Sequence, residues 1–315
     1  MRILVEGWRF VPHSYATINQ FQLLELLKRR NLELFHIDAP YLKPWQPIVG
    51  LFDADVEAAL RNIPHPRALE PIDVKLRMFF PANLKDSTAT RTFVFSTTEW
   101  GHVIAQDLML MGVKSFEQAH ADSNAIIITS SQWSRDGFLR SGADPDRVAI
   151  VPHGVDLDIY KPLSDEEKND LRCALGWEND FIFLNVGNPT RNKGLPFLFK
   201  AFATVVERYP NAKLVLKGVN SLFPGKDFTA ELNKIIGNIL TSAEIARIEK
   251  RFCYIGTAMS FAEVARLYQA ADAYVSPYIA EGFNLPVLEA IACGLPVICT
   301  KGGSTDDFTN ADFAW

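Results

Sequence analysis

The sequence has no hydrophobic run approaching the ~18 consecutive apolar residues that cross a bilayer. Its N-terminus carries Arg2 and Glu6 and therefore lacks the apolar segment of a secretory signal peptide. The four cysteines all lie in the second half of the chain, and none forms a CxxC pair. These absences predict a cytoplasmic protein with reduced thiols, and they leave open a peripheral contact with the inner face of a membrane.

An excess of positive charge is also lacking. The net charge is −5, with 16 basic and 19 acidic residues over 1–160 and 16 and 18 over the remainder. Nucleic-acid-binding domains concentrate lysine and arginine on one face, so no nucleic-acid partner is expected. No G-x-G-x-x-G follows the first apolar segment, which counts against a dinucleotide-binding domain. No Asp-x-Asp pair stands in a suitable strand-end context, so neither a metal nor a cofactor is expected.

What the sequence does contain is enough apolar residues, 48%, for large cores, and a length of 315 residues that favours two domains. Short apolar segments alternate with helical patterns, which is typical of α/β domains with parallel sheets. We expect domains at 1–165 and 166–315, divided near the polar segment that opens with Ser164. The expected strands are 1–7, 32–38, 74–80, 92–98, 125–130 and 148–151, then 181–186, 212–219, 253–257, 273–277 and 297–300.

Two glutamates mark the segment most indicative of function. Glu281 stands in a glycine turn after the strand 273–277, and Glu289 falls inside the helical segment 285–293. Ligands of parallel sheets bind beyond the carboxyl ends of the strands, where helix N-termini present unpaired amides to anions such as phosphate. Two solvated acids on a surface turn and helix would be the alternative explanation of the pair alone.

A second glycine turn carries basic residues. The strand 181–186 is followed by Gly187-Asn188-Pro189-Thr190-Arg191-Asn192-Lys193-Gly194 and then by a helix. Arginine and lysine in a loop that opens a helix are suited to phosphate binding. Solvated loop cations would be the alternative for this segment by itself.

These segments together resemble retaining glycosyltransferases of family 4, which have the GT-B architecture. The resemblance rests on E-G-F-N-L-P-V-L-E at 281–289, the following A-C-G-L-P-V at 292–297, and S-Q-W-S at 131–134. It implies an α/β fold of two Rossmann-like α/β/α domains, with parallel sheets that face a central cleft. The family continues for several dozen residues beyond the glycine turn at 302–303, so the resemblance suggests a fragment or an unusual member.

The resemblance also implies roles for individual residues. Lys193 matches the family's lysine on the donor diphosphate, whereas Asn188 occupies its arginine position and Arg191 is a suspected substitute. Glu281 would bind the donor sugar, and Glu289 the ribose hydroxyls. The remaining expected donor-binding residues are Gly187, Gly282, Phe283, Asn284 and Leu285, with the backbone of Thr257 and Ala258 at the base.

The acceptor side is less well matched. His13 and Ser14 follow the first strand, where the family's acceptor loop lies, although Ser14 would serve equally well as a helix cap. The family commonly has a catalytic histidine after a mid-domain strand, and this sequence offers Glu99 and His102 there, neither as a clean match.

The expected function is metal-independent transfer of a sugar, with retention, from a UDP- or GDP-sugar to a glycan, lipid or other acceptor. An epimerase on the same fold and a degenerate nucleotide-sugar-binding protein are the alternatives. A phosphorylase is disfavoured because no lysine context for pyridoxal is found.

Overall fold

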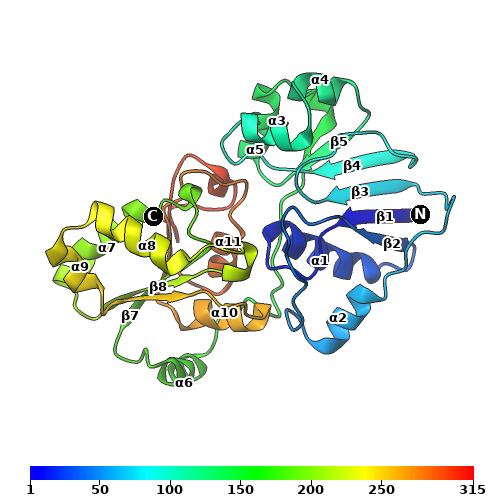
Figure 1. The fold of residues 1–315 in the computed structure, drawn as a ribbon. Coiled ribbons are helices and arrows are strands. Elements are labelled where there is room, and N and C mark those ends of the chain that lie inside the picture. The colour runs from blue at the N-terminus through cyan, green and yellow to red at the C-terminus, as the bar shows by residue number, and fades with distance from the viewer. The chain divides into compact units, whose positions relative to one another are not determined.

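The computed structural model describes residues 1–315 and divides into two compact units, Met1–His153 and Gly154–Trp315 (Figure 1). The sequence placed the boundary at 165/166. The structure places it at 153/154 because the segment between is apolar enough to pack on unit 2. Within it, Tyr160 is buried and Ile159 and Leu163 pack against the same core.

Unit 1 contains a six-stranded, fully parallel sheet in the order β2-β1-β3-β4-β5-β6. In Figure 1, α1 and α2 lie near β1 and β2, and α3, α4 and α5 lie near β4 and β5. The strands are β1 Arg2–Gly7, β2 Glu33–Asp38, β3 Val74–Met78, β4 Arg91–Phe95, β5 Ile126–Thr129 and β6 Val148–Ile150. The helices are α1 Ser14–Leu27, α2 Ala54–Arg61, α3 Ala105–Met111, α4 Phe116–Ala121 and α5 Gln132–Arg140.

Unit 2 contains a five-stranded parallel sheet in the order β11-β10-β7-β8-β9. The strands are β7 Phe181–Val186, β8 Ala212–Lys217, β9 Phe252–Ile255, β10 Ala273–Ser276 and β11 Val297–Cys299. The helices are α6 Asp165–Leu175, α7 Leu195–Arg208, α8 Phe228–Ile239, α9 Ser242–Ile248, α10 Phe261–Ala270 and α11 Leu285–Ala292. Short 3₁₀ turns cover Pro145–Arg147, Arg191–Lys193, Asn220–Leu222 and Ser304–Asp307.

Alternate residues of β8 separate the two cores of unit 2, as the two-residue period of a strand requires. Leu214 and Leu216 pack in the core formed with α7, α8 and α9. Val215 packs on the other face, in the core to which α10 and α11 contribute. A sheet buried on both faces explains the nearly continuous apolar strands.

Helix α10 begins after Ser260, which is its N-cap. The backbone N–H of Glu263 donates to Ser260 Oγ at 3.1 Å, and the N–H of Ser260 donates to Glu263 Oε2 at 2.7 Å. This reciprocal pair satisfies two amides that a helix start leaves unpaired. Ser260 and Glu263 therefore form a capping box that fixes the start of α10.

Candidate active site

Two loops meet at the carboxyl-end rim of the unit 2 sheet. One follows β7 and spans 187–194, and the other follows β10 and spans 277–284; the two strands are neighbours in the sheet. Asn192 joins the loops, because its carbonyl oxygen accepts from Ile279 N at 2.7 Å and its side-chain amide donates to Ala280 O at 3.2 Å. The two glycine turns that the sequence singled out are thus bonded to each other.

An ion pair lies across this junction. The ammonium of Lys193 donates to Glu281 Oε1, and only 21% and 8% of the two side chains are exposed. Charge-assisted hydrogen bonds of this kind are strong, and removing either partner leaves a nearly buried charge without compensation. The structure therefore brings together the two residues expected to contact the diphosphate and the sugar of a donor.

The first turn of α11 adds amide donors to the same rim. Asn284 precedes the helix in a left-handed conformation, with φ 74°, and its side-chain amide donates to Ser276 Oγ at 3.0 Å. Pro286 has no N–H, and Val287 N bonds to Asn284 O at 3.0 Å. The amides of Asn284 and Leu285 are therefore the ones that this helix start can offer to an anion.

Gly282 and Phe283, the other expected members of this turn, are buried beside Glu281. The ring of Phe283 lies 4.8 Å, centroid to centroid, from that of Phe308. The side chain of Phe283 is thus buried against Phe308 and anchors the turn in the core.

Glu289 lies one turn into α11 and is held from α10. Its Oε2 accepts from the Tyr268 hydroxyl at 2.7 Å, and the residue is partly exposed. Burial raises the pKa of this carboxyl from its ordinary value of 4.5 to about 7. Tyr268 thus fixes the direction of the carboxyl group, and contact with a ribose stays a prediction.

The raised pKa gives a testable pH dependence of stability. A carboxyl whose pKa is higher in the folded state stabilises the fold while protonated, and that contribution is lost as pH rises through about 7. We expect Glu289→Gln, which imitates the protonated form, to gain stability relative to the wild type between pH 5 and pH 8. The gain is at most about 3 kcal/mol, since one pKa unit corresponds to ~1.4 kcal/mol.

Urea denaturation of both proteins at several pH values measures this difference. Both proteins contain the same histidines, so the effect of histidine titration on stability cancels in the comparison. Equal pH dependence of the two proteins would show that Glu289 titrates as an ordinary surface carboxyl.

Two further polar residues of the β7 loop, Asn188 and Arg191, differ in their surroundings. Arg191 is exposed in the 3₁₀ turn before Lys193. The side-chain oxygen of Asn188 accepts from Val219 N at 2.6 Å, and so ties the start of the loop to the exit of β8. The side chain of Asn188 is thus engaged within the fold. Arg191, the suspected substitute for the family's arginine, is the arginine of this loop that is exposed to solvent.

Thr257 and Ala258 follow β9 at the same rim and are both exposed. The sequence missed their neighbour Lys217, whose Nζ donates to Thr257 O at 2.8 Å. A lysine directly after the apolar residues 214–216 of a buried strand was the available signal, because such a position seldom holds a charge.

On unit 1, the residues expected on the acceptor side lie around the start of α1. His13 is the helix cap, since its Nδ1 accepts from Tyr15 N at 3.3 Å, and Ser14 is the first helical residue and exposed. The suggestion that Ser14 caps this helix is therefore wrong. The His13 ring packs 5.1 Å from Trp8 and 5.3 Å from Trp45, within an aromatic cluster at the loop after β1.

Glu99 and His102 lie in the loop after β4, and both are exposed. The carbonyl oxygen of Glu99 accepts from Trp133 Nε1 at 3.0 Å, and His102 Nδ1 lies 3.2 Å from Trp100 O. The buried ring of Tyr15 lies 5.1 Å from that of Phe95 at the end of β4, and burial raises the pKa of its hydroxyl to about 12. The sequence gave no signal for Tyr15.

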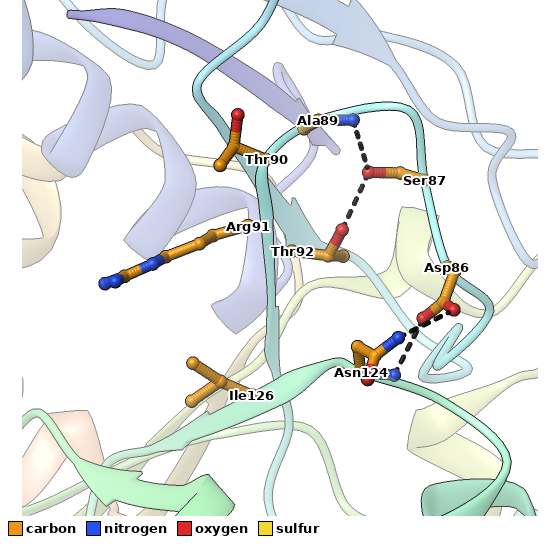
Figure 2. Close-up of a pocket in the computed structure, with 8 residues that line it drawn as sticks. All are labelled: Asp86, Ser87, Ala89, Thr90, Arg91, Thr92, Asn124 and Ile126. Atoms are coloured by element: carbon orange, nitrogen blue, oxygen red, sulfur yellow. Dashed lines mark hydrogen bonds between the residues drawn. The ribbon is translucent and has the colours of Figure 1, made fainter.

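A separate hollow in unit 1 lies at the opposite ends of the strands, where β4 and β5 begin (Figure 2). Its polar groups are bonded to one another: Asn124 N donates to Asp86 Oδ1 at 2.7 Å, and the Ser87 and Thr92 hydroxyls are 2.7 Å apart. It holds none of the residues expected to act in catalysis. Its lining residues are Asp86, Ser87, Ala89, Thr90, Arg91, Thr92, Asn124 and Ile126.

No group of three or more histidine, cysteine or carboxylate side chains is arranged to hold a metal ion. None of the helices combines the length and the apolar character needed to span a membrane.

Comparison with known proteins agrees with the features of unit 2. Residues 167–313 match the family described as glycosyl transferases group 1. A D-inositol 3-phosphate glycosyltransferase of Paenarthrobacter aurescens is 29% identical over 188 residues, which are 59% of this chain and 43% of that protein. The chain thus spans less than half the length of this relative.

Solved structures match both units. Anabaena Alr3699/HepE, in complex with UDP-glucose, has a TM-score of 0.69 and 18% identity, with 100% of this chain and 85% of that chain covered. A glycosyltransferase from Rickettsia africae has a TM-score of 0.68 and 15% identity, with 100% and 83% covered. At such identities the likeness concerns the fold, and it confirms the architecture expected from the sequence. The chain therefore has the GT-B fold, and residues 167–313 of its second unit are similar to the glycosyl transferases group 1.

Proposed function

We propose that this protein is a retaining glycosyltransferase that uses a nucleoside-diphosphate sugar without a metal ion. The observation that carries the proposal is the Lys193–Glu281 contact at the junction of two bonded glycine turns. It supports the proposal because a cation suited to a diphosphate and a carboxylate suited to a sugar hydroxyl lie side by side at the rim where parallel sheets bind ligands.

The proposed chemistry is charge stabilisation at the leaving group. As the bond between sugar and diphosphate breaks, negative charge grows on the phosphate oxygens. Lys193, Arg191 and the amides at the start of α11 would stabilise that charge, and groups fixed before the reaction do so most effectively. Glu281 would orient the donor sugar, Glu289 the ribose, and the backbone at Thr257 and Ala258 the base.

The nucleotide is the first question for experiment. The GT-B neighbour in complex with UDP-glucose makes UDP the first candidate, with GDP and ADP beside it. A nucleotide at a hundred times its dissociation constant stabilises the protein by ~2.7 kcal/mol, so thermal shift with and without EDTA detects it. A shift abolished by EDTA would contradict metal independence, and no shift with any nucleotide would contradict the proposed function.

Glu281→Gln should separate binding from turnover. The amide keeps the size of the side chain but loses its charge. We expect donor hydrolysis and transfer to fall by about 100-fold or more, as for the loss of a group that stabilises a transition state, while UDP affinity changes little. The measurement is release of UDP from UDP-glucose, with Glu207→Gln, an exposed glutamate of α7, as the control.

The same assay tests the two alternatives. A degenerate sugar-nucleotide-binding protein would bind UDP-glucose with no turnover in the wild type. An epimerase would convert UDP-glucose into its epimer with no net release of UDP, and an acceptor would not change its rate. The name of the Paenarthrobacter relative makes D-inositol 3-phosphate a first acceptor to test, followed by glycan and lipid acceptors.

A further inference from the structure

A lysine is buried at the carboxyl-end rim of the unit 2 sheet. Lys217 ends β8, which lies between β7 and β9, and only 2% of the residue is exposed. Its backbone carbonyl accepts from Gly187 N at 2.8 Å, at the first residue of the loop that carries Lys193. The backbone of Lys217 is therefore joined to the start of the β7 loop.

The ammonium is bonded to carbonyl oxygens and to no carboxylate. It donates to Gly218 O and, at 2.8 Å, to Thr257 O, so it bridges the loops after β8 and β9. Glu263 of α10 acts on it only through its field, because that carboxylate is engaged in the capping box with Ser260. Burial outweighs this field and lowers the pKa of Lys217 to about 8.

A buried charge without a counterion costs free energy, and a methionine of similar length would avoid that cost. Packing of the core therefore does not explain a lysine at position 217. The position of Lys217 suggests what offsets the cost. The ammonium donates to the carbonyl next to Ala258, and the backbone of Lys217 is bonded to the first residue of the loop that carries Lys193.

We propose that Lys217 is a positioning residue of the nucleotide site, which holds the backbone at Thr257 in place for the base and lends its positive charge to the binding of the diphosphate. The inference rests on the proposed function, since it assumes that a nucleoside diphosphate binds at this rim. It adds a third cation that none of the sequence motifs indicates.

Lys217→Met tests the proposal because the affinity for UDP should fall while the stability of the fold should not. Removal of an uncompensated buried charge should leave the melting temperature unchanged or raise it. The affinity for UDP, measured by calorimetry, should fall about 10-fold or more, the loss typical of a charged hydrogen bond. The control is Lys213→Met on the same strand, where the lysine pairs with Asp180 away from the carboxyl-end rim.

Lys217→Gln separates the two contributions. Glutamine still offers N–H donors to the carbonyls but has no charge, so uridine should bind as to the wild type and UDP more weakly. Unchanged UDP affinity in either folded variant would overturn the inference, as would failure of both variants to fold, which would make Lys217 a structural residue. If the wild type binds no nucleoside diphosphate, the proposed function fails instead.

Discussion

Lys193→Met should reduce the affinity for UDP by about 100-fold and abolish transfer. The lysine supplies a charged hydrogen bond in a largely buried setting, where such bonds contribute most. Uridine lacks the diphosphate, so its affinity should be nearly unchanged. Calorimetry with UDP and uridine, together with an assay of UDP release, measures all three quantities.

Lys193→Met should also lower the stability of the fold, and this loss must be distinguished from the loss of UDP affinity. Without Lys193, the nearly buried carboxylate of Glu281 has lost its cation, which is costly. The double variant Lys193→Met/Glu281→Gln removes both charges and should regain stability without regaining UDP affinity. Lys200→Met, an exposed lysine of α7 paired with Glu244, is the matched control. Equal losses of UDP and uridine affinity would mean that Lys193 supports the fold of the site and does not contact a phosphate.

Much of the fold could be predicted because its strands are short apolar segments that end in glycine turns. Gly187 follows β7 and Gly256 follows β9, and both glycines were visible in the sequence. The helices α3 and α4 were not expected, since each has only six or seven residues and too few turns to show a period. The division at 153/154 depends on how Tyr160 packs, which no local pattern contains.

The candidate site, like the fold, could be predicted only in part. Both glycine turns and their charged residues were found from local spacing. The hydrogen bond that joins the two turns could not be predicted, because Asn192 and Ala280 are 88 residues apart in the sequence. Lys217 and Tyr268 were missed for a related reason: each acts on a residue that a different strand or helix brings near, and neither belongs to a motif.

Gly194→Ala should disrupt the junction of the two loops and, with it, nucleotide binding. A Cβ at this position would lie 1.8 Å from Pro277 O, against backbone that cannot rotate away. The residue also has φ 67°, a conformation that costs an L-residue about 1–2 kcal/mol. We expect a loss of about 4 kcal/mol or more in the free energy of unfolding, measured with urea, because the overlap adds to the conformational cost.

Gly176→Ala isolates the overlap from the conformation. Gly176 has φ 66° and follows α6, but nothing lies within 4 Å of its Cβ position. This variant should lose only about 1–2 kcal/mol and should bind UDP as the wild type does. The difference between the two alanine variants therefore measures what it costs to separate the β7 loop from the β10 loop. If they lose equal stability and both bind UDP, close contact between the loops is not what holds Lys193 against Glu281.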